Sequence, residues 1–127
     1  TVTINRPEKL NAYCIQMRDD LYEVMGAIKL DDEIRVAVIK GAGEKAFCAG
    51  ADLKERATLS PTEVKQFIFT IRNLFTSIEY LPKPVIAMVN GYAIGGGHVL
   101  HVMCDLTVAS ENAYSSWEPC RRIALCS

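Results

Sequence analysis

The chain has 127 residues, enough for one domain or part of one, and its 14 basic and 15 acidic side chains give a formal net charge of −1. This balance argues against nucleic acid as a partner, because nucleic-acid-binding proteins usually carry a clear basic excess. Half of the residues are hydrophobic, which excludes a disordered tail, and polar residues interrupt the longest apolar stretches, so we expect no membrane-spanning segment.

Targeting and cysteine signals are weak. The chain opens without the basic and apolar segments of a secretory signal peptide. Its first residue is Thr1 and not Met, so we expect its natural start to lie upstream. The five cysteines are scattered and form no CxxC pair, which disfavours a disulfide framework and a zinc site. We therefore expect no bound metal. We expect the thiols to be buried or incidental and not reactive, and the protein to lie in a reducing, cytoplasmic location. The cysteines are Cys14, Cys48, Cys104, Cys120 and Cys126.

The first third of the chain reads as strand, helix and strand. Alternation predicts a strand over Val2–Ile4, which Pro7 stops. Apolar side chains then recur every three or four residues, as on one face of a helix. Asp31 closes this helix, and Val36–Ile39 predicts a short, fully buried strand before a Gly41–Gly43 turn. The helix positions are Met17, Leu21, Val24, Met25 and Ile28.

A second helix is predicted to begin after Ser60. Ser60, Pro61 and Glu63 supply an N-cap, a proline at the first helical position and an acid three residues after the cap. An apolar stripe follows, and Pro82 and Pro84 end the helix. The stripe comprises Val64, Phe67, Ile68, Ile71, Leu74, Phe75 and Ile78.

Residues 85–109 are predicted to form a strand, a turn, a helix and a further strand. Val85–Val89 predicts another apolar strand, and an Asn90-Gly91 turn follows it. The triplet Gly95–Gly97 opens a third helix that extends to about Cys104, and Leu106–Ala109 is the last clear strand. Strands alternating with helices predict an α/β fold, and no linker indicates an internal domain boundary.

The chain has two glycine-containing loops, 46–54 and 90–98. Each loop follows a predicted apolar strand and precedes a helix, so the order of strand, loop and helix occurs twice. Small residues let a ligand approach the backbone closely, so that amide N–H groups can point into a cleft. Two such donors on one oxygen form an oxyanion hole, in which each is worth about 2.7–4 kcal/mol in the transition state. A glycine triplet before a helix is nevertheless more often a turn or a close packing contact. Neither loop matches a phosphate-binding motif.

At these loops the chain resembles the N-terminal half of the enoyl-CoA hydratase/isomerase family, also called the crotonase superfamily. Order and spacing agree from residue 1 to about residue 113, and family members are roughly twice as long as this chain. The matching segments are Asn5-Arg6-Pro7-Glu8-Lys9-Leu10-Asn11-Ala12, Phe47-Cys48-Ala49-Gly50-Ala51-Asp52-Leu53-Lys54-Glu55, Asn90-Gly91-Tyr92-Ala93-Ile94-Gly95-Gly96-Gly97 and Cys104-Asp105-Leu106.

The resemblance implies an incomplete crotonase-like spiral of ββα turns that binds acyl-CoA thioesters, with coenzyme A as part of the substrate and no separate cofactor. It assigns the two oxyanion amides, which stabilise a thioester enolate, to Ala49 and Gly96. Lys9 and Leu10 would lie near the nucleotide end of coenzyme A. Full-length relatives are expected to form homotrimers or hexamers. The acyl-CoA pocket would be lined by Ala49, Gly50, Ala51, Asp52 and Leu53.

The chain departs from the hydratase pattern at both catalytic glutamates. The first should stand two residues after the glycine triplet, where this chain has Val99, which cannot transfer a proton. The second should fall at Pro119, and the neighbouring Glu118 is more simply a solvated residue than a displaced acid. Because the pattern stops near residue 113, we expect a crotonase-like core fragment over 1–113 and a divergent tail over 114–127.

Three functions remain open. The first is a hydratase/isomerase-like protein that stabilises a thioester enolate, and the second is a ring-forming lyase like 1,4-dihydroxy-2-naphthoyl-CoA synthase, whose branch also has a non-acidic residue at the position of Val99. The third is an inactive fragment that binds coenzyme A or a partner subunit. His98 and His101 can share one helix side but are expected to be packing or surface residues. Tyr92 is expected to pack, and Asp52 is expected to fix its loop by hydrogen bonds.

Overall fold

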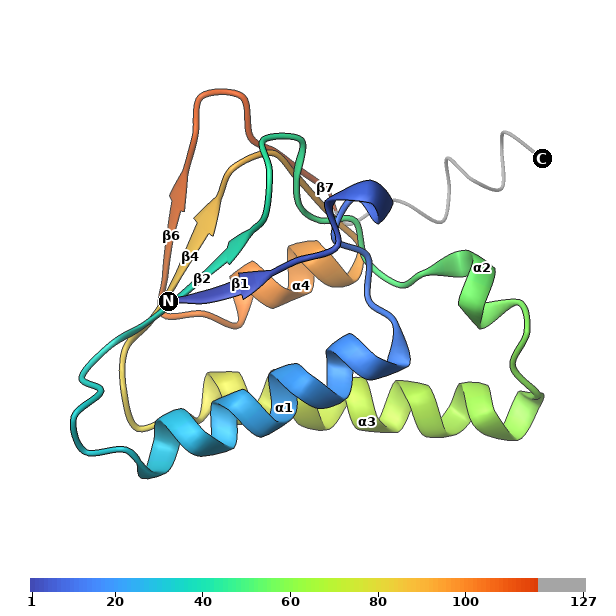
Figure 1. Ribbon diagram of the computed structural model, residues 1–127, viewed down its shortest axis with the longest axis horizontal. Coiled ribbons are helices and arrows are strands. Elements are labelled where there is room, and N and C mark those ends of the chain that lie inside the picture. The colour runs from blue at the N-terminus through green and yellow to red at the C-terminus, as the bar shows by residue number, and fades with distance from the viewer. Residues whose placement is uncertain (117–127) are drawn as a thin grey trace.

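The computed structural model describes residues 1–116, which form two parallel sheets with helices around them (Figure 1). The first sheet contains β1 (Val2–Ile4), β2 (Ala37–Gly41), β4 (Val85–Val89) and β6 (Leu106–Ala109), in this spatial order. The second contains β3 (Ala46–Cys48), β5 (Tyr92–Ile94) and β7 (Tyr114–Ser116). The helices are the 3-10 helix η1 (Pro7–Lys9), α1 (Ile15–Leu30), α2 (Leu53–Arg56), α3 (Pro61–Glu79) and α4 (Gly96–Val102).

The chain winds as a spiral in which each turn adds one strand to each sheet. The order is β2, β3 and then α2 and α3, followed by β4, β5 and α4, followed by β6 and β7. Strands β2, β4 and β6 lie side by side, with Ile39 paired to Ala87 and Ala87 paired to Thr107. Strands β3, β5 and β7 do the same in the second sheet, where Ala93 pairs with Ser115. The predicted α/β class and ββα spiral are therefore confirmed.

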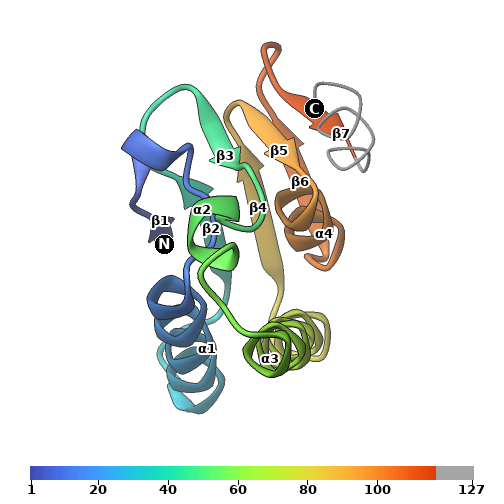
Figure 2. The same cartoon turned by 90° about the vertical axis from the view of Figure 1, so that its right-hand side faces the viewer.

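Local sequence signals explain the two long helices. The Cys14 Sγ accepts a hydrogen bond from the Met17 N–H at 3.4 Å and caps α1. Ser60 and Glu63 form the predicted capping box at the start of α3, so this helix begins where the sequence indicates, whereas the Cys14 cap of α1 was not predicted. The two helices lie side by side beneath the first sheet in both views (Figures 1 and 2). Their inward faces bury Leu21, Met25, Ile28, Phe67, Leu74 and Ile78.

The strand predicted over Val36–Ile39 needs correction. Strand β2 begins one residue later and is not fully buried, because its side chains alternate between the two faces of the sheet. Ala37 and Ile39 are buried towards the helices, whereas Lys40 is exposed and Val36, which precedes the strand, is 45% exposed. The alternate residues of this apolar run therefore bury their side chains on one face of the sheet. On the other face, the neighbouring side chains remain partly or fully exposed within the described residues.

Five short elements were not predicted: η1, β3, β5, β7 and α2. Each has three or four residues, too few for a periodic pattern, and three of them lie in or beside the glycine loops. Tyr114–Ser116 pairs with β5, so the second sheet continues past residue 113. The proposed division into a 1–113 core and a 114–127 tail stays a prediction, and residues 117–127, with Glu118 and Pro119, lie outside the described residues.

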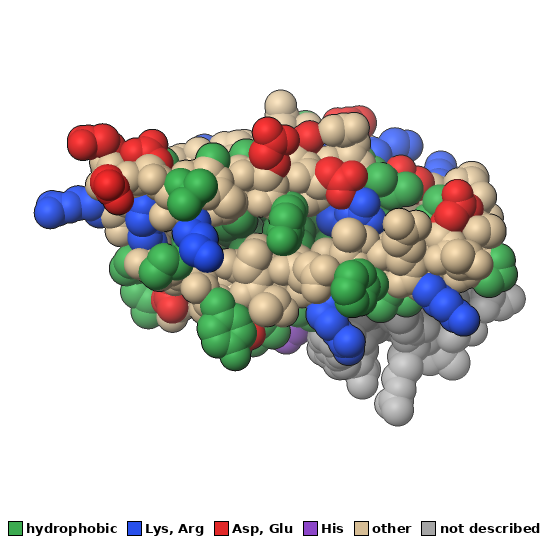
Figure 3. Space-filling model, turned by 90° about the horizontal axis from the view of Figure 1, so that it is seen from below, with side chains coloured by type: hydrophobic (Ala, Val, Ile, Leu, Met, Phe, Trp, Pro, Cys, Tyr) green, Lys and Arg blue, Asp and Glu red, His purple; other side chains and the backbone are tan. Residues whose placement is uncertain are grey.

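The face formed by α1 and α3 is mixed in character. Seen from below, acidic and basic side chains are interspersed with hydrophobic ones, so this face has no patch of a single charge (Figure 3). Among the described helices, none is long and apolar enough to cross a membrane. Large exposed hydrophobic side chains on these two helices include Tyr22, Val24, Leu30, Ile68 and Phe69.

Candidate functional site

The two glycine loops meet at Gly50 and Gly96. Gly50 has a φ of +87°, and a Cβ at this position would lie 2.8 Å from the Ile94 carbonyl oxygen and 3.1 Å from the Gly96 nitrogen. A Cβ on Gly96 would in turn lie 3.6 Å from the Gly50 Cα. The backbones of the two loops are therefore in contact, at the place where the sequence predicts the oxyanion amides.

The backbone amides of Ala49 and Ala51 in the first loop point in different directions, because Gly50, with a φ of +87°, interrupts the extended chain between them. The Ala49 N–H donates to the Leu10 carbonyl oxygen at 3.0 Å. Ala51 forms an isolated parallel bridge with Tyr13, in which the Tyr13 N–H donates to the Gly50 carbonyl oxygen at 2.7 Å and the Asp52 N–H donates to the Tyr13 carbonyl oxygen at 2.8 Å. In such a bridge the N–H of the central residue points away from the partner strand. The Ala51 N–H therefore points away from Tyr13.

This difference in direction decides which amides are available. Ala49, predicted as an oxyanion donor, already has a protein acceptor for its N–H. Among residues 1–116, by contrast, neither the Ala51 N–H nor the Gly96 N–H donates a hydrogen bond. Gly96 is the first residue of α4, where an N–H has no acceptor inside the helix. The two amides left open at the loop contact are those of Ala51 and Gly96.

Tyr13 lies under this contact and was not predicted to take part in the site. Its side chain is 1% exposed, and a Cβ on Gly96 would lie 3.1 Å from the Tyr13 Cε2 atom. Its ring packs edge-on against Phe75 of α3, with centroids 6.1 Å apart. Burial raises the pKa of the Tyr13 hydroxyl well above its ordinary value, so this hydroxyl stays protonated. No pattern in the sequence marks this tyrosine, because it lies between two helices in a segment without periodicity.

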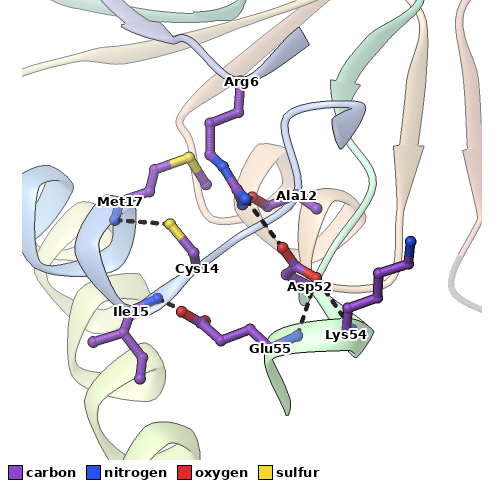
Figure 4. A network of polar contacts seen from close by, with 8 residues as sticks. All are labelled: Arg6, Ala12, Cys14, Ile15, Met17, Asp52, Lys54 and Glu55. Carbon is purple, nitrogen blue, oxygen red and sulfur yellow. Dashed lines mark hydrogen bonds and ion pairs between the residues drawn. The ribbon is translucent and has the colours of Figure 1, made fainter. Parts of the chain in front are cut away.

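An ion pair fixes the loop that carries Ala51 (Figure 4). The Arg6 Nη2 lies 3.1 Å from the Asp52 Oδ2, and the Arg6 Nη1 donates to the Ala12 carbonyl oxygen at 2.7 Å. The Asp52 Oδ1 accepts the N–H groups of Lys54 and Glu55 at 3.1 and 3.3 Å, which makes Asp52 the N-cap of α2. The hydrogen-bonding role expected of Asp52 is therefore observed, and Arg6 is its unpredicted partner.

The same network reaches the start of α1. The Glu55 Oε2 accepts the Ile15 N–H at 2.9 Å, and Ile15 is the first residue of that helix (Figure 4). Partial burial acts to raise the pKa of Asp52, but the hydrogen bonds from Arg6 and from the α2 amides outweigh it and hold the pKa below its ordinary value. The carboxylate therefore stays ionised at neutral pH and keeps α2 joined to the 6–13 segment.

We expect Asp52→Asn to remove a pH-dependent part of the stability. A carboxylate whose pKa is lowered in the folded state stabilises the fold above the unfolded-state value of about 3.9, and this contribution disappears as the pH falls through the folded-state pKa. Urea unfolding between pH 3 and 6 should show a shallower acid loss for Asp52→Asn than for the parent chain. Asp32→Asn, in the exposed turn after α1, is the matched control and should follow the parent. Equal slopes for all three proteins would contradict the role of this ion pair.

The Asn11 side chain joins the 6–13 segment to residues 42–46 by hydrogen bonds. The residue is fully buried with a φ of +55°, and its Oδ1 accepts the Arg6 N–H at 2.9 Å. Its Nδ2 donates to the carbonyl oxygens of Ala42 and Ala46 at 3.0 and 2.8 Å. One side chain therefore connects the segment after β1 with the turn between β2 and β3.

The other predicted binding residues surround the same loop. Lys9 ends η1 and is exposed, and Leu10, with a φ of +52°, is 39% exposed beside the amide of Ala49. Leu53 opens α2 and is 51% exposed. The structure thus brings Leu10, which follows Lys9, next to the first loop, while the contact of both residues with a nucleotide stays a prediction.

Acid–base groups are missing where the hydratase pattern places them. Val99 is half-buried in the first turn of α4, and its N–H donates to the Gly95 carbonyl oxygen at 3.0 Å. His98 and His101 share one side of α4 as predicted, and their rings stand edge-to-face with centroids 4.9 Å apart. Tyr92 packs in the same way against Tyr114, with centroids 6.1 Å apart. Within the described residues, no group of three or more His, Cys, Asp or Glu side chains could hold a metal ion.

The cysteine thiols near the site are poor nucleophiles. Cys48 is fully buried in β3, and burial raises the pKa of its thiol to about 12. Burial, aided by the charge of Asp105, raises the pKa of Cys104 to about 12 as well. Both side chains are therefore thiols at neutral pH, as expected for packing residues. Cys120 and Cys126 lie outside the described residues.

Comparison with known proteins agrees with this geometry. Residues 1–119 match the family model described as enoyl-CoA hydratase/isomerase. The short-chain-enoyl-CoA hydratase of Clostridium acetobutylicum is 43% identical over 112 residues, which cover 88% of this chain and 43% of that protein. The chain therefore spans less than half the length of this curated relative.

Solved structures give the same assignment. An enoyl-CoA hydratase from Bacillus anthracis superimposes with a TM-score of 0.87 and 41% identity, over 89% of this chain and 44% of that one. An enoyl-CoA hydratase/carnithine racemase from Magnetospirillum magneticum gives a TM-score of 0.85 and 34% identity, over 90% of this chain and 43% of that one. The chain belongs to the enoyl-CoA hydratase/isomerase family.

Proposed function

We propose that this chain binds an acyl-CoA thioester and polarises its carbonyl group with two backbone amides, those of Ala51 and Gly96. The observation that carries the proposal is the contact between the two glycine loops, which leaves these two N–H groups without an acceptor among residues 1–116. Ala51 replaces Ala49 in this role because the Ala49 N–H is occupied by the Leu10 carbonyl oxygen. The relatives named as enoyl-CoA hydratases support the thioester class.

Two amide donors suit a thioester enolate. When a proton leaves the carbon next to the carbonyl, negative charge develops on the carbonyl oxygen, and fixed N–H groups stabilise that charge more than the neutral ground state. Each donor is worth about 2.7–4 kcal/mol in comparable sites. Lys9 and Leu10 would lie beside the nucleotide of coenzyme A, where the exposed ammonium group of Lys9 suits phosphate.

Hydration of a double bond needs proton transfer as well. Val99 has no titratable group, and the second glutamate position falls on Pro119, outside the described residues. We therefore propose binding and carbonyl polarisation for this chain and expect little or no hydration of 2-enoyl-CoA by it. Loss of the conjugated enoyl absorption at high protein concentration would overturn the second expectation and leave the first intact.

A pair of variants at one position tests the amide. Proline is well tolerated at the first position of a helix and replaces the N–H with a ring carbon, so Gly96→Pro removes the proposed donor. Gly96→Ala keeps the N–H and controls for the added Cβ, which would lie 3.1 Å from the Tyr13 Cε2 atom. A conjugated dienoyl-CoA absorbs at longer wavelength when its carbonyl accepts strong hydrogen bonds. We expect the parent and Gly96→Ala to shift its absorption band to the red, and Gly96→Pro to lose most of this shift.

The same titrations give affinities and separate the outcomes. We expect Gly96→Pro to weaken binding by about two- to tenfold, the loss of one hydrogen bond of about 0.5–1.5 kcal/mol. Circular dichroism checks that both variants fold. An unshifted band with the parent chain, or an equal red shift with Gly96→Pro, would refute the oxyanion role of this amide.

The non-acidic residue at position 99 keeps a second activity open, a ring-forming lyase like naphthoyl-CoA synthase. Incubation with an aryl-succinyl-type CoA ester tests it, because this activity predicts a cyclised product from that substrate and no change in enoyl-CoA. Binding of both thioesters without turnover of either leaves the chain as a coenzyme A-binding member of the family.

A further inference from the structure

A cluster of polar side chains lies between α4 and the strands β6 and β7, and only its member His98 belongs to one of the two glycine loops. The Ser115 Oγ lies 2.6 Å from the His98 Nδ1 and 2.8 Å from the His101 Nε2. The His101 Nδ1 lies 3.2 Å from the Thr107 Oγ1. Ser115 and Thr107 are exposed residues, and both histidines are half-buried. Neither the proposed thioester site nor the family assignment gives this cluster a role.

The hydrogen bonds determine which nitrogen of His101 carries the proton. The Thr107 hydroxyl donates its single proton to the His101 carbonyl oxygen at 3.2 Å. The contact between Thr107 Oγ1 and His101 Nδ1 therefore requires that Nδ1 carry a proton and donate it. In the neutral ring, Nε2 is then an acceptor, and the lone pair of this nitrogen faces the Ser115 hydroxyl.

The remaining contacts follow from this assignment. Ser115 has one hydroxyl proton, which it donates to the His101 Nε2 at 2.8 Å. The 2.6 Å contact with the His98 Nδ1 then requires a proton on that nitrogen, so His98 donates to the serine oxygen. The arrangement is a hydroxyl held between a base that can take its proton and a donor that can stabilise the resulting oxygen. Thr107 orients the base.

We propose that Ser115 is a nucleophile activated by His101, with Thr107 as a positioning residue, and that it accepts acyl groups from activated esters or thioesters. Serine, an imidazole within hydrogen-bond reach and a third group that fixes the ring are the parts of a nucleophilic hydrolase site. The proposal is independent of acyl-CoA binding at Ala51 and Gly96.

The reaction balances without a further reactant except water. The Ser115 Oγ attacks the acyl carbon while its proton passes to the His101 Nε2, the bond from carbon to the leaving group breaks, and the leaving group takes that proton. An acyl ester on Ser115 results. His101 then removes a proton from water, the hydroxide attacks the ester, and the Ser115 Oγ leaves with the proton, which releases the carboxylic acid.

The protonation state of His101 at neutral pH favours this role. Burial, with a smaller contribution from the neighbouring His98, lowers the pKa of His101 below its ordinary value of 6.5. The ring is thus neutral near pH 7, with its proton on Nδ1, and takes up a second proton only in more acidic solution. Of the groups in contact with its ring nitrogens, Ser115 and Thr107 are hydroxyls and His98 is a second imidazole.

A fluorophosphonate probe tests the proposal on the full 127-residue chain. The serine oxygen attacks phosphorus and fluoride leaves, so the adduct marks the nucleophile. Peptide mass mapping of the parent chain should place the adduct on Ser115, a result that depends on no variant. We expect Ser115→Ala to abolish this adduct and Ser110→Ala, in the exposed loop after β6, to leave it unchanged.

Rates of labelling test the base and its orientation. His101→Gln should slow labelling by about 100-fold or more, in the range for loss of a general base, and Thr107→Val should slow it less. The parent rate should fall as the pH drops below 6.5, and the rate of His101→Gln should lose this dependence. An adduct on another residue, no adduct, or a His101→Gln rate equal to the parent would overturn the proposal.

Discussion

Gly97→Ala is expected to destabilise the fold by about 3 kcal/mol or more, or to prevent folding. A Cβ at this position would lie 1.9 Å from the Cys48 carbonyl oxygen and 2.7 Å from the carbonyl carbon. Both atoms belong to the backbone of β3, and Cys48 is fully buried, so no change of rotamer can relieve the overlap. The helix α4 would have to move away from β3, which would also separate Gly96 from Gly50.

A second glycine provides a matched control for this prediction. Gly26 lies on the exposed side of α1, where an added Cβ would meet nothing within 4 Å. Gly26→Ala should therefore stabilise the chain by about 0.5–1 kcal/mol, because alanine loses less conformational freedom in a helix. Urea unfolding of the two variants should give midpoints on opposite sides of the parent. A Gly97→Ala midpoint at or above that of the parent would contradict the close approach of α4 and β3.

Local signals in the sequence predict the elements whose cause is itself local. The capping box at Ser60 and the apolar stripe after it predict α3, because both act within a few residues along one helix. Strands β3 and β5 depend instead on pairing with each other and with β7, and a three-residue strand contains no periodic signal of its own. The fold class follows from the order of the elements, whereas the second sheet needs contacts between distant segments.

The same distinction holds for the candidate site. The glycine loops identify the place where two amides can meet, because small residues are visible in the sequence. Which amide faces the site depends on the bridge between Tyr13 and Ala51 and on Gly50, whose φ of +87° interrupts the extended chain between Ala49 and Ala51. The sequence therefore locates the loop, and only the pairing with Tyr13 distinguishes Ala51 from Ala49. Arg6 and Asn11 lie in a segment that matches the family, but the sequence does not show their distant partners. These are Asp52 for Arg6 and the carbonyl groups of Ala42 and Ala46 for Asn11.

Asn11→Asp is expected to be about as damaging as Gly97→Ala, through charge and not through volume. Aspartate has nearly the same shape as asparagine and also tolerates the φ of +55° at this position, so the backbone preference is retained. It cannot donate when ionised, and it would place a buried negative charge 3.0 and 2.8 Å from the carbonyl oxygens of Ala42 and Ala46. The loss of two hydrogen bonds and the unpaired charge should cost about 3–5 kcal/mol at neutral pH.

The pH dependence identifies this cause. Burial beside two carbonyl oxygens would raise the pKa of the new carboxyl in the folded state, so the folded chain would hold its proton where the unfolded chain has lost it. The penalty should then be small below the unfolded-state value of about 3.9 and should grow as the pH rises. Urea unfolding of the variant should accordingly recover towards the parent at pH 4, while Asn112→Asp, in an exposed turn, should match the parent throughout. A penalty for Asn11→Asp that does not change with pH would mean that shape, and not hydrogen bonding by Asn11, holds the 6–13 segment against β3.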